Sequence, residues 1–171
     1  MKKKILISLL CVFISISGVA QIQRTFFNLQ LGISERSEVF NYFEKKGKHV
    51  IEYDDETLIV NKIRFGGEEW NTVSFKFYNN KLMSVLFIQS DQTTSQNEIM
   101  EMKNNLYQKL MKKYKAYYNS TLSDDEWTIF KDDVTDLSMR YSFFEGACLL
   151  GLFYSDYKLL FLRQDNDNDE L

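Results

Sequence analysis

The chain contains no proline and only seven glycines in 171 residues. No Pro/Ser/Gly-rich linker divides the sequence, so we expect one compact domain after processing. Its one histidine, His49, is the residue that a Ser/His/Asp triad or a histidine metal site would need. His49 stands beside a predicted strand start, which favours a solvated edge position. We therefore expect a non-enzymatic protein without a metal or cofactor.

Cysteine is equally scarce, with Cys11 and Cys148 the only two. Cys11 falls within residues 1–20, which have the pattern of a signal peptide: three lysines, an apolar run, and small residues at the end of the segment. It lies in the middle of that run rather than at its end, which is not the position of a lipoprotein anchor. We expect cleavage after Ala20, and hence a bacterial protein that is periplasmic or secreted. No second apolar stretch is long enough to cross a membrane.

The mature chain keeps a single cysteine and so has no internal disulfide, which leaves its core to hold the fold. A chain of about 150 residues can do this, since it buries roughly 70% of its unfolded surface. Cys148 lies in an apolar run and is expected to be buried rather than nucleophilic. Removal of the signal peptide leaves 18 Lys and Arg against 24 Asp and Glu. Nucleic acid is not an expected partner of such an acidic chain.

The clearest β segment runs from Trp70 to Gln89. Two strand-like runs flank Asn79-Asn80, a pair that tolerates the positive φ angles of a tight hairpin turn. A two-residue loop would pair Phe77 with Leu82, Phe75 with Ser84 and Val73 with Leu86 on one side of the sheet.

The other side of this hairpin is apolar and aromatic, and it supplies the candidate binding residues. They are Trp70, Tyr78, Met83, Val85 and Phe87. An exposed apolar face of more than a few hundred Å² is usually a binding site or is covered by another chain. The alternative is that the sheet curls or pairs, so that these side chains belong to the core. Both interpretations stay open at the level of sequence.

Two helices are predicted. Residues 95–118 begin with the capping-box pattern Ser95-x-x-Glu98, and apolar side chains follow at three- and four-residue intervals. Residues 34–46 begin with Ser34 as the cap and end before Gly47. Together with six to eight antiparallel strands, these helices predict an α+β fold with both helices packed on one face of the sheet.

The domain 21–164 divides into halves, 26–90 and 94–164, that each run helix, strand, hairpin. Their hairpins share a faint pattern, V-S-F-K-F against L-S-M-R-Y. Alternating strands resemble one another by chance, so a duplication into two α-β-β-β halves and a chance likeness both stay open. Residues 165–171, D-N-D-N-D-E-L, have nothing to bury and are expected to be a disordered acidic tail.

Three acidic pairs could in principle supply the two carboxylates of an acid/base couple. They are Asp54-Asp55, Asp124-Asp125 and Asp132-Asp133. All three fall in predicted turns, where adjacent acids usually stabilise the turn and stay solvated, so we interpret them as turn formers.

The segment Leu31–Phe43, L-G-I-S-E-R-S-E-V-F-N-Y-F, resembles the L-G-x-S-x-x-x-V start of modules in the family of the beta-lactamase inhibitor protein and the small outer-membrane assembly lipoproteins. In that family a helical segment precedes a run of antiparallel strands, and the tandem form makes one long sheet with helices on one face. The resemblance implies binding of a protein partner and no active site. The chain lacks the disulfides of the inhibitor and a lipobox, so no functional residue is carried over.

These observations predict an exported, non-enzymatic interaction module that binds a protein partner, or a second copy of itself, through the aromatic sheet face. The alternative is a periplasmic carrier for a small apolar ligand held between sheet and helix.

Overall fold

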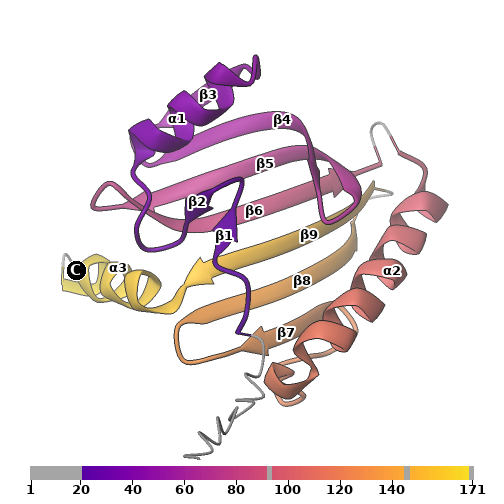
Figure 1. Ribbon diagram of the computed structural model, residues 1–171. Coiled ribbons are helices and arrows are strands. Elements are labelled where there is room, and N and C mark those ends of the chain that lie inside the picture. Colours follow the sequence, from indigo (N-terminus) through magenta and orange to yellow (C-terminus); the bar gives the residue numbers. More distant parts are fainter. Residues whose placement is uncertain (1–20, 92–93, 145–146, 170–171) are drawn as a thin grey trace, which may run out of the picture.

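The computed structural model describes residues 21–91, 94–144 and 147–169. The expected signal peptide, residues 92–93 and 145–146, and the last two residues of the tail lie outside this part of the chain. A seven-stranded antiparallel sheet dominates the fold, in the order β3-β4-β5-β6-β9-β8-β7 (Figure 1). Its strands are β3 (Val50–Asp54), β4 (Thr57–Phe65), β5 (Glu68–Tyr78), β6 (Lys81–Ser90), β7 (Trp127–Lys131), β8 (Thr135–Phe144) and β9 (Ala147–Asp156). The predicted α+β class is confirmed.

The sheet consists of two meanders that meet at its centre. Strands β3 to β6 follow one another in space, as do β7 to β9, and the last strand of each meander pairs with the other. In that central pair Ser84 of β6 lies opposite Ser155 of β9. Each meander follows a helix, although the first has four strands and the second three. A duplication of the two halves stays a prediction.

One face of the sheet is covered by three elements (Figure 1). Helix α1 (Arg36–Lys45) packs on β3 and β4, and helix α2 (Gln96–Tyr114) packs on β9. The short hairpin β1 (Thr25–Phe26)–β2 (Leu29–Gln30) lies between them. Both predicted helices are therefore present on one face. None of the helices in the described ranges is long and apolar enough to span a membrane.

The predicted capping box starts α2. The Glu98 backbone N–H donates to Ser95 Oγ at 3.3 Å, and the Ser95 N–H donates to the Glu98 carboxylate at 2.9 Å. These bonds satisfy two of the donors that a helix start leaves open. The apolar stripe turns toward the sheet and is buried; it comprises Ile99, Met102, Leu106, Leu110 and Tyr114. After Tyr114 a 3-10 turn (Lys115–Tyr117) replaces the last turn of the predicted helix.

The predicted cap of α1 was wrong by one residue. The helix begins at Arg36 with Glu35 in the cap position, and Glu38 accepts a hydrogen bond from the Glu35 N–H at 2.8 Å. Ser34 instead accepts a bond from the Gln30 N–H at 3.0 Å. The Ser34 hydroxyl therefore stabilises the turn after β2 and does not cap α1. A short hydroxyl side chain can serve either purpose.

Aromatic side chains form the centre of the core. Phe65 and Phe87 stack with ring centroids 4.4 Å apart, and Phe26 from β1 contacts both of them and Tyr154. Phe26, Phe87 and Tyr154 are at most 3% exposed. Burying one such ring stabilises the fold by about 1.5–3 kcal/mol. The β1–β2 hairpin is thus a packed part of the domain, held to the sheet by Phe26.

The hairpin of β5 and β6 has the predicted turn but a different register. Asn79 and Asn80 have φ angles of 49° and 60°, as the turn requires. Phe77 lies opposite Leu82 as expected, but a bulge then leaves Met83 without a partner. Beyond the bulge the expected pairs were wrong: Phe75 lies opposite Val85, and Val73 opposite Phe87. One extra residue moves every following side chain of β6 to the opposite face.

A third helix, α3 (Tyr157–Asp169), follows β9 directly and was not predicted. The expectation of a disordered tail was therefore wrong for residues 165–169, which are helical. Asp156 caps the helix, since its Oδ1 accepts the Leu159 N–H at 2.9 Å. Arg163 then pairs with Glu56 in the β3–β4 turn at 2.9 Å. These polar contacts hold a helix whose first half is apolar and whose end, residues 165–169, has no apolar side chain.

Candidate functional site on the free sheet face

The five predicted binding residues do not form an exposed face. Trp70, Val85 and Phe87 are 0% exposed and Met83 is 2% exposed, while Tyr78 is half-buried. The bulge at Met83 turns Val85 and Phe87 toward α1 and α2. Lys62, with a φ of 55°, interrupts the β4–β5 ladder and precedes the buried pair Ile63–Trp70. The prediction of a partner surface is therefore wrong for four of the five residues. These four belong to the core: Trp70, Met83, Val85 and Phe87.

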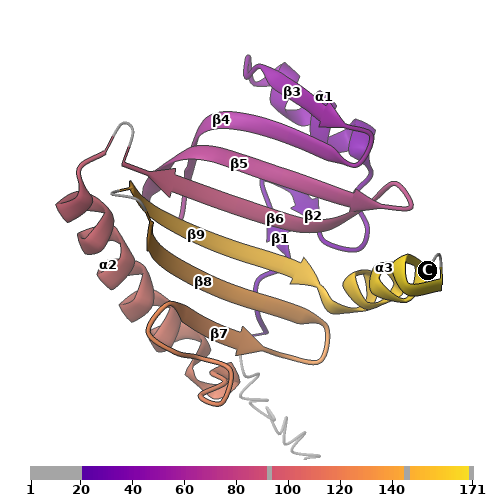
Figure 2. The same ribbon diagram turned by 180° about the vertical axis from the view of Figure 1, so that it is seen from behind.

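The face that α1, α2 and the β1–β2 hairpin leave free carries other residues (Figure 2). Strand register places its side chains in rows across the sheet. One row comprises Ser74, Leu86, Phe153, Ser138 and Ile129, and the next comprises Thr72, Ile88, Gly151, Arg140 and Trp127. The face that α1 and α2 leave free thus exists, with α3 over one end of it, but its apolar residues come from β6, β7 and β9 in a different register.

An apolar groove of about 440 Å³ crosses this face. Leu86, Ile88, Leu149 and Phe153 supply most of its apolar wall, and Leu149 is 39% exposed. Gly151 lies in the middle of β9, where it contributes no side chain to the groove. A Cβ at this position would lie 3.6 Å from Leu86 Cδ1, an ordinary contact, so the site accepts a larger residue. We call this hollow the face groove.

A tryptophan and an arginine border the face groove at β7 and β8. The Arg140 guanidinium lies over the Trp127 ring at 4.9 Å from its centroid, and Glu126 is 3.4 Å from the same guanidinium. The cation–π contact and the weak ion pair hold Arg140 along the border while leaving the residue exposed. Trp, Phe and Arg are the residue types enriched in binding surfaces.

A second hollow of about 270 Å³ adjoins the face groove beneath α3, and we call it the α3 hollow. It shares Trp127, Ser138 and Phe153 with the face groove, while Leu160 of α3 borders it from above. Ser155 and Asp136, opposite each other on β9 and β8, also line it. The two hollows together form one mostly apolar concave surface, with Ser155 and Asp136 at its α3 end.

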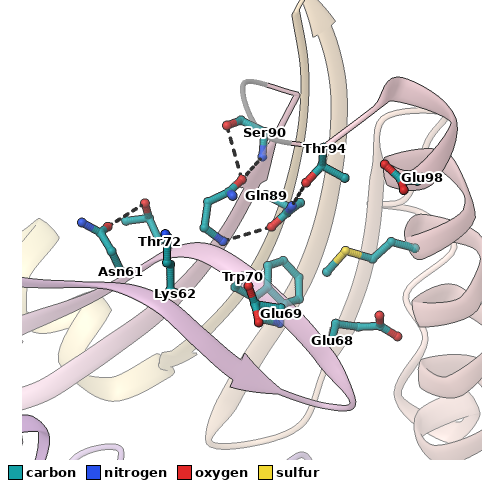
Figure 3. A pocket seen from close by; sticks show the side chains of 12 residues that line it. Asn61, Lys62, Glu68, Glu69, Trp70, Thr72, Gln89, Ser90, Thr94 and Glu98 are labelled. Carbon is teal, nitrogen blue, oxygen red and sulfur yellow. Dashed lines mark hydrogen bonds between the residues drawn. The ribbon is translucent and has the colours of Figure 1, made fainter. Parts of the chain in front are cut away.

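A larger hollow, of about 700 Å³, lies elsewhere, at the end of the sheet beside the start of α2 (Figure 3). Polar side chains line it, and they bond to one another. Gln89 accepts the Asn71 N–H at 3.0 Å and donates to Thr94, while Asn71 accepts the Ser90 N–H at 2.8 Å (Figure 3). Glu98 is held by Ser95, and the two hydrogen bonds from Ser95 lower the pKa of its carboxyl group. These bonds join the sheet end to α2, which is a structural role.

The remaining candidates have structural surroundings. His49 is exposed, and Cys148 is 1% exposed with its Sγ 3.3 Å from the Tyr141 hydroxyl. That hydrogen bond, followed by burial, raises the pKa of Tyr141. Asp124 and Asp132 each accept two backbone N–H groups of their own turns, as expected of turn formers. Within the described ranges, no three His, Cys, Asp or Glu residues are grouped so that they could hold a metal ion.

No family model, no curated protein and no solved structure matches this chain.

Sequence reasoning missed the residues of both hollows. The missing information was the bulge, since the alternation of β6 reads equally well in either register once both faces are apolar. One signal was present: Gly151 interrupts a strand of large apolar residues, and a glycine inside a strand often marks a close approach or a hollow.

Proposed function

We propose that this protein is an exported, non-enzymatic interaction module that binds a protein partner through the free face of its sheet. The face groove is the observation that carries the proposal. It is apolar and has an aromatic–arginine border, on a face that α1, α2 and the β1–β2 hairpin leave open. A surface of this kind, apolar at its centre and polar at its border, is typical of protein–protein interfaces.

The mechanism is one of rigid recognition. Strands β6, β9 and β8 are interior strands of the sheet, bonded on both sides, and the opposite faces of their ladders are packed against the core. The groove is thus preformed, so little ordering of its walls opposes binding. The likeness of Leu31–Phe43 to the inhibitor and assembly-lipoprotein modules supports the same class of function.

A second candidate function is a carrier of a small apolar ligand, and the volume of the face groove favours it. A hollow of about 440 Å³ lies within the usual range of ligand sites. The place expected for such a ligand, between sheet and helix, is filled by side chains of the core such as Ile99 and Leu106. A carried ligand would therefore occupy the face groove.

Native mass spectrometry of residues 21–171, purified from the exported fraction of the source cells, tests the proposal. The variant Gly151→Val fills the groove floor, and valine is well suited to a strand. Ile33→Lys, at a residue 58% exposed outside the groove, is the matched control. We expect a bound polypeptide with the wild type and the control and none with Gly151→Val.

Two outcomes would change the assignment. A polypeptide that stays bound to Gly151→Val uses another surface and contradicts the proposal. An adduct of a few hundred daltons, lost in Gly151→Val, would establish the carrier instead.

A further inference from the structure

Two polar residues, Ser155 and Asp136, lie among the mostly apolar side chains that line the floor of the α3 hollow. Ser155 is 0% exposed, and its Oγ makes no hydrogen bond in the described part of the chain. Asp136 Oδ1, on the neighbouring strand, is likewise solvent-inaccessible, and its charged neighbour is the Lys131 ammonium group at 3.2 Å, outside hydrogen-bond geometry. Buried polar groups are nearly always paired, because an unpaired one loses its water without compensation. A buried hydroxyl without a partner, on the residue opposite a carboxylate that has one ion pair, points to a ligand group that bonds to both, since both residues line one hollow.

From this arrangement we propose that the α3 hollow receives a tyrosine side chain of the partner protein. The proposal rests on the function proposed above. The phenol hydroxyl would donate to Asp136 Oδ1 and accept from Ser155 Oγ. The ring would lie among Ile129, Phe153 and Leu160.

The charges around the floor select a neutral group. Lys131 Nζ lies 3.2 Å from Asp136 Oδ1, at ion-pair distance but outside hydrogen-bond geometry, and 3.9 Å from the Tyr157 ring centroid. An ammonium or guanidinium group of the occupant would meet this lysine, and a carboxylate would meet Asp136. A hydroxyl group can donate to the carboxylate and accept from the serine without either repulsion.

The walls of the hollow select a ring rather than a chain. Phe153 and Trp127 present aromatic side chains, and aromatic pairs stabilise beyond the area that they bury. The hollow of about 270 Å³ has room for one phenol ring, and it opens into the face groove, where the rest of the partner would lie.

NMR titration of the ¹⁵N-labelled protein, residues 21–171, with p-cresol and toluene tests the inference, because the two compounds differ only in the hydroxyl group. We expect p-cresol to shift the amide signals of Ser155 and Asp136 and to bind about tenfold more tightly than toluene, as a hydrogen bond to a charged acceptor provides. In Ser155→Ala and Asp136→Asn the affinity for p-cresol should exceed that for toluene by no more than about twofold, while toluene still binds as in the wild type. The amide spectra of both variants report whether they fold.

Equal binding of p-cresol and toluene by the wild type would overturn the inference, and so would no binding of either. Acetyl-Leu-Tyr-Leu-amide and its phenylalanine counterpart distinguish the source of the phenol. If p-cresol binds but the tyrosine peptide does not, the ligand is a free phenol and the assignment to a protein side chain is wrong. The Gly151→Val test of the face groove is independent, since Gly151 does not line the α3 hollow.

Discussion

The guanidinium of Arg24 pairs with the carboxylate of Asp156, which joins the segment before β1 to the start of α3. Arg24 also donates to the backbone oxygens of Val134 at 2.6 Å and Leu31 at 3.1 Å. One side chain thus connects the N-terminal hairpin, the β7–β8 turn and the end of β9. The side chains are 20% and 9% exposed, so the pair is only weakly screened by solvent.

Gly32 is the residue that lets this ion pair form. Its φ is +76°, and a Cβ there would lie 2.6 Å from Asp156 Oδ2. Gly47 offers a matched control, with a φ of +69° and nothing within 4 Å of its Cβ position. We expect Gly47→Ala to lower the free energy of unfolding by about 1 kcal/mol and Gly32→Ala by about 3 kcal/mol, because the latter also displaces the ion pair. Urea denaturation measures both, and equal losses would show that the close approach carries no cost.

The Asp156 carboxylate has a second role at the start of α3. Asp156→Ala removes the helix cap and leaves Arg24 without its buried partner, so we expect a loss of about 2–3 kcal/mol in the free energy of unfolding. Hydrogen exchange should show α3 amides losing protection before those of the sheet. Asp125→Ala, at an exposed turn residue, is the control and should leave α3 protected. Unchanged protection of α3 in Asp156→Ala would contradict this role of the cap.

The bulge at Met83 predicts opposite outcomes at two adjacent residues. Phe87 is 0% exposed and neighbours five aromatic rings of the core, whereas Ile88 lies half-buried in the face groove. Phe87→Glu should cost about 4 kcal/mol or more and unfold much of the protein, because it buries an unpaired charge. Ile88→Glu should change stability by about 1 kcal/mol or less and abolish partner binding.

Circular dichroism at increasing urea concentration measures the stability of both variants, and native mass spectrometry measures binding. The reverse pattern, a folded Phe87→Glu and an unfolded Ile88→Glu, would place the bulge elsewhere and restore the simple alternation of β6.

The features that the sequence predicts correctly have local causes. The start of α2 follows from Ser95 and Glu98, three residues apart, and the hairpin turn follows from the tolerance of Asn79 and Asn80 for positive φ. Each depends on contacts within a few residues, so the pattern carries the information.

The features that sequence reasoning missed depend on distant contacts. Arg24 and Asp156 are 132 positions apart, and α3 is ordered by residues of the β3–β4 turn and of β5. The bulge at Met83 exchanges the two faces of β6. Because both faces are apolar, the hydrophobic periodicity is the same with or without the bulge. The face groove was missed for the same reason. Two helices packed on one face of the sheet predict a free face opposite them, but which residues of β6 lie on that face depends on the one-residue shift at Met83.

The free energy of unfolding should fall at alkaline pH, because the pKa values of the Tyr154 and Tyr141 hydroxyl groups are raised in the folded protein. Burial first, and the nearby Tyr114 second, strongly raise the pKa of Tyr154, which is 3% exposed. Where the pKa is higher in the folded state, the stabilisation is complete below the unfolded value near pH 10 and is lost as the pH rises above it, since only the unfolded chain then releases the proton. We expect the free energy of unfolding, measured in urea between pH 8 and about 11.5, to decline above about pH 10 by up to ~1.4 kcal/mol per pH unit for Tyr154 alone.

Tyr154→Phe should make the decline shallower by about that amount, while Tyr53→Phe, at a residue 72% exposed, should keep the wild-type slope. Equal slopes for the two variants would mean that Tyr154 ionises as readily in the folded protein as in the unfolded chain, and that the core opens around its hydroxyl group.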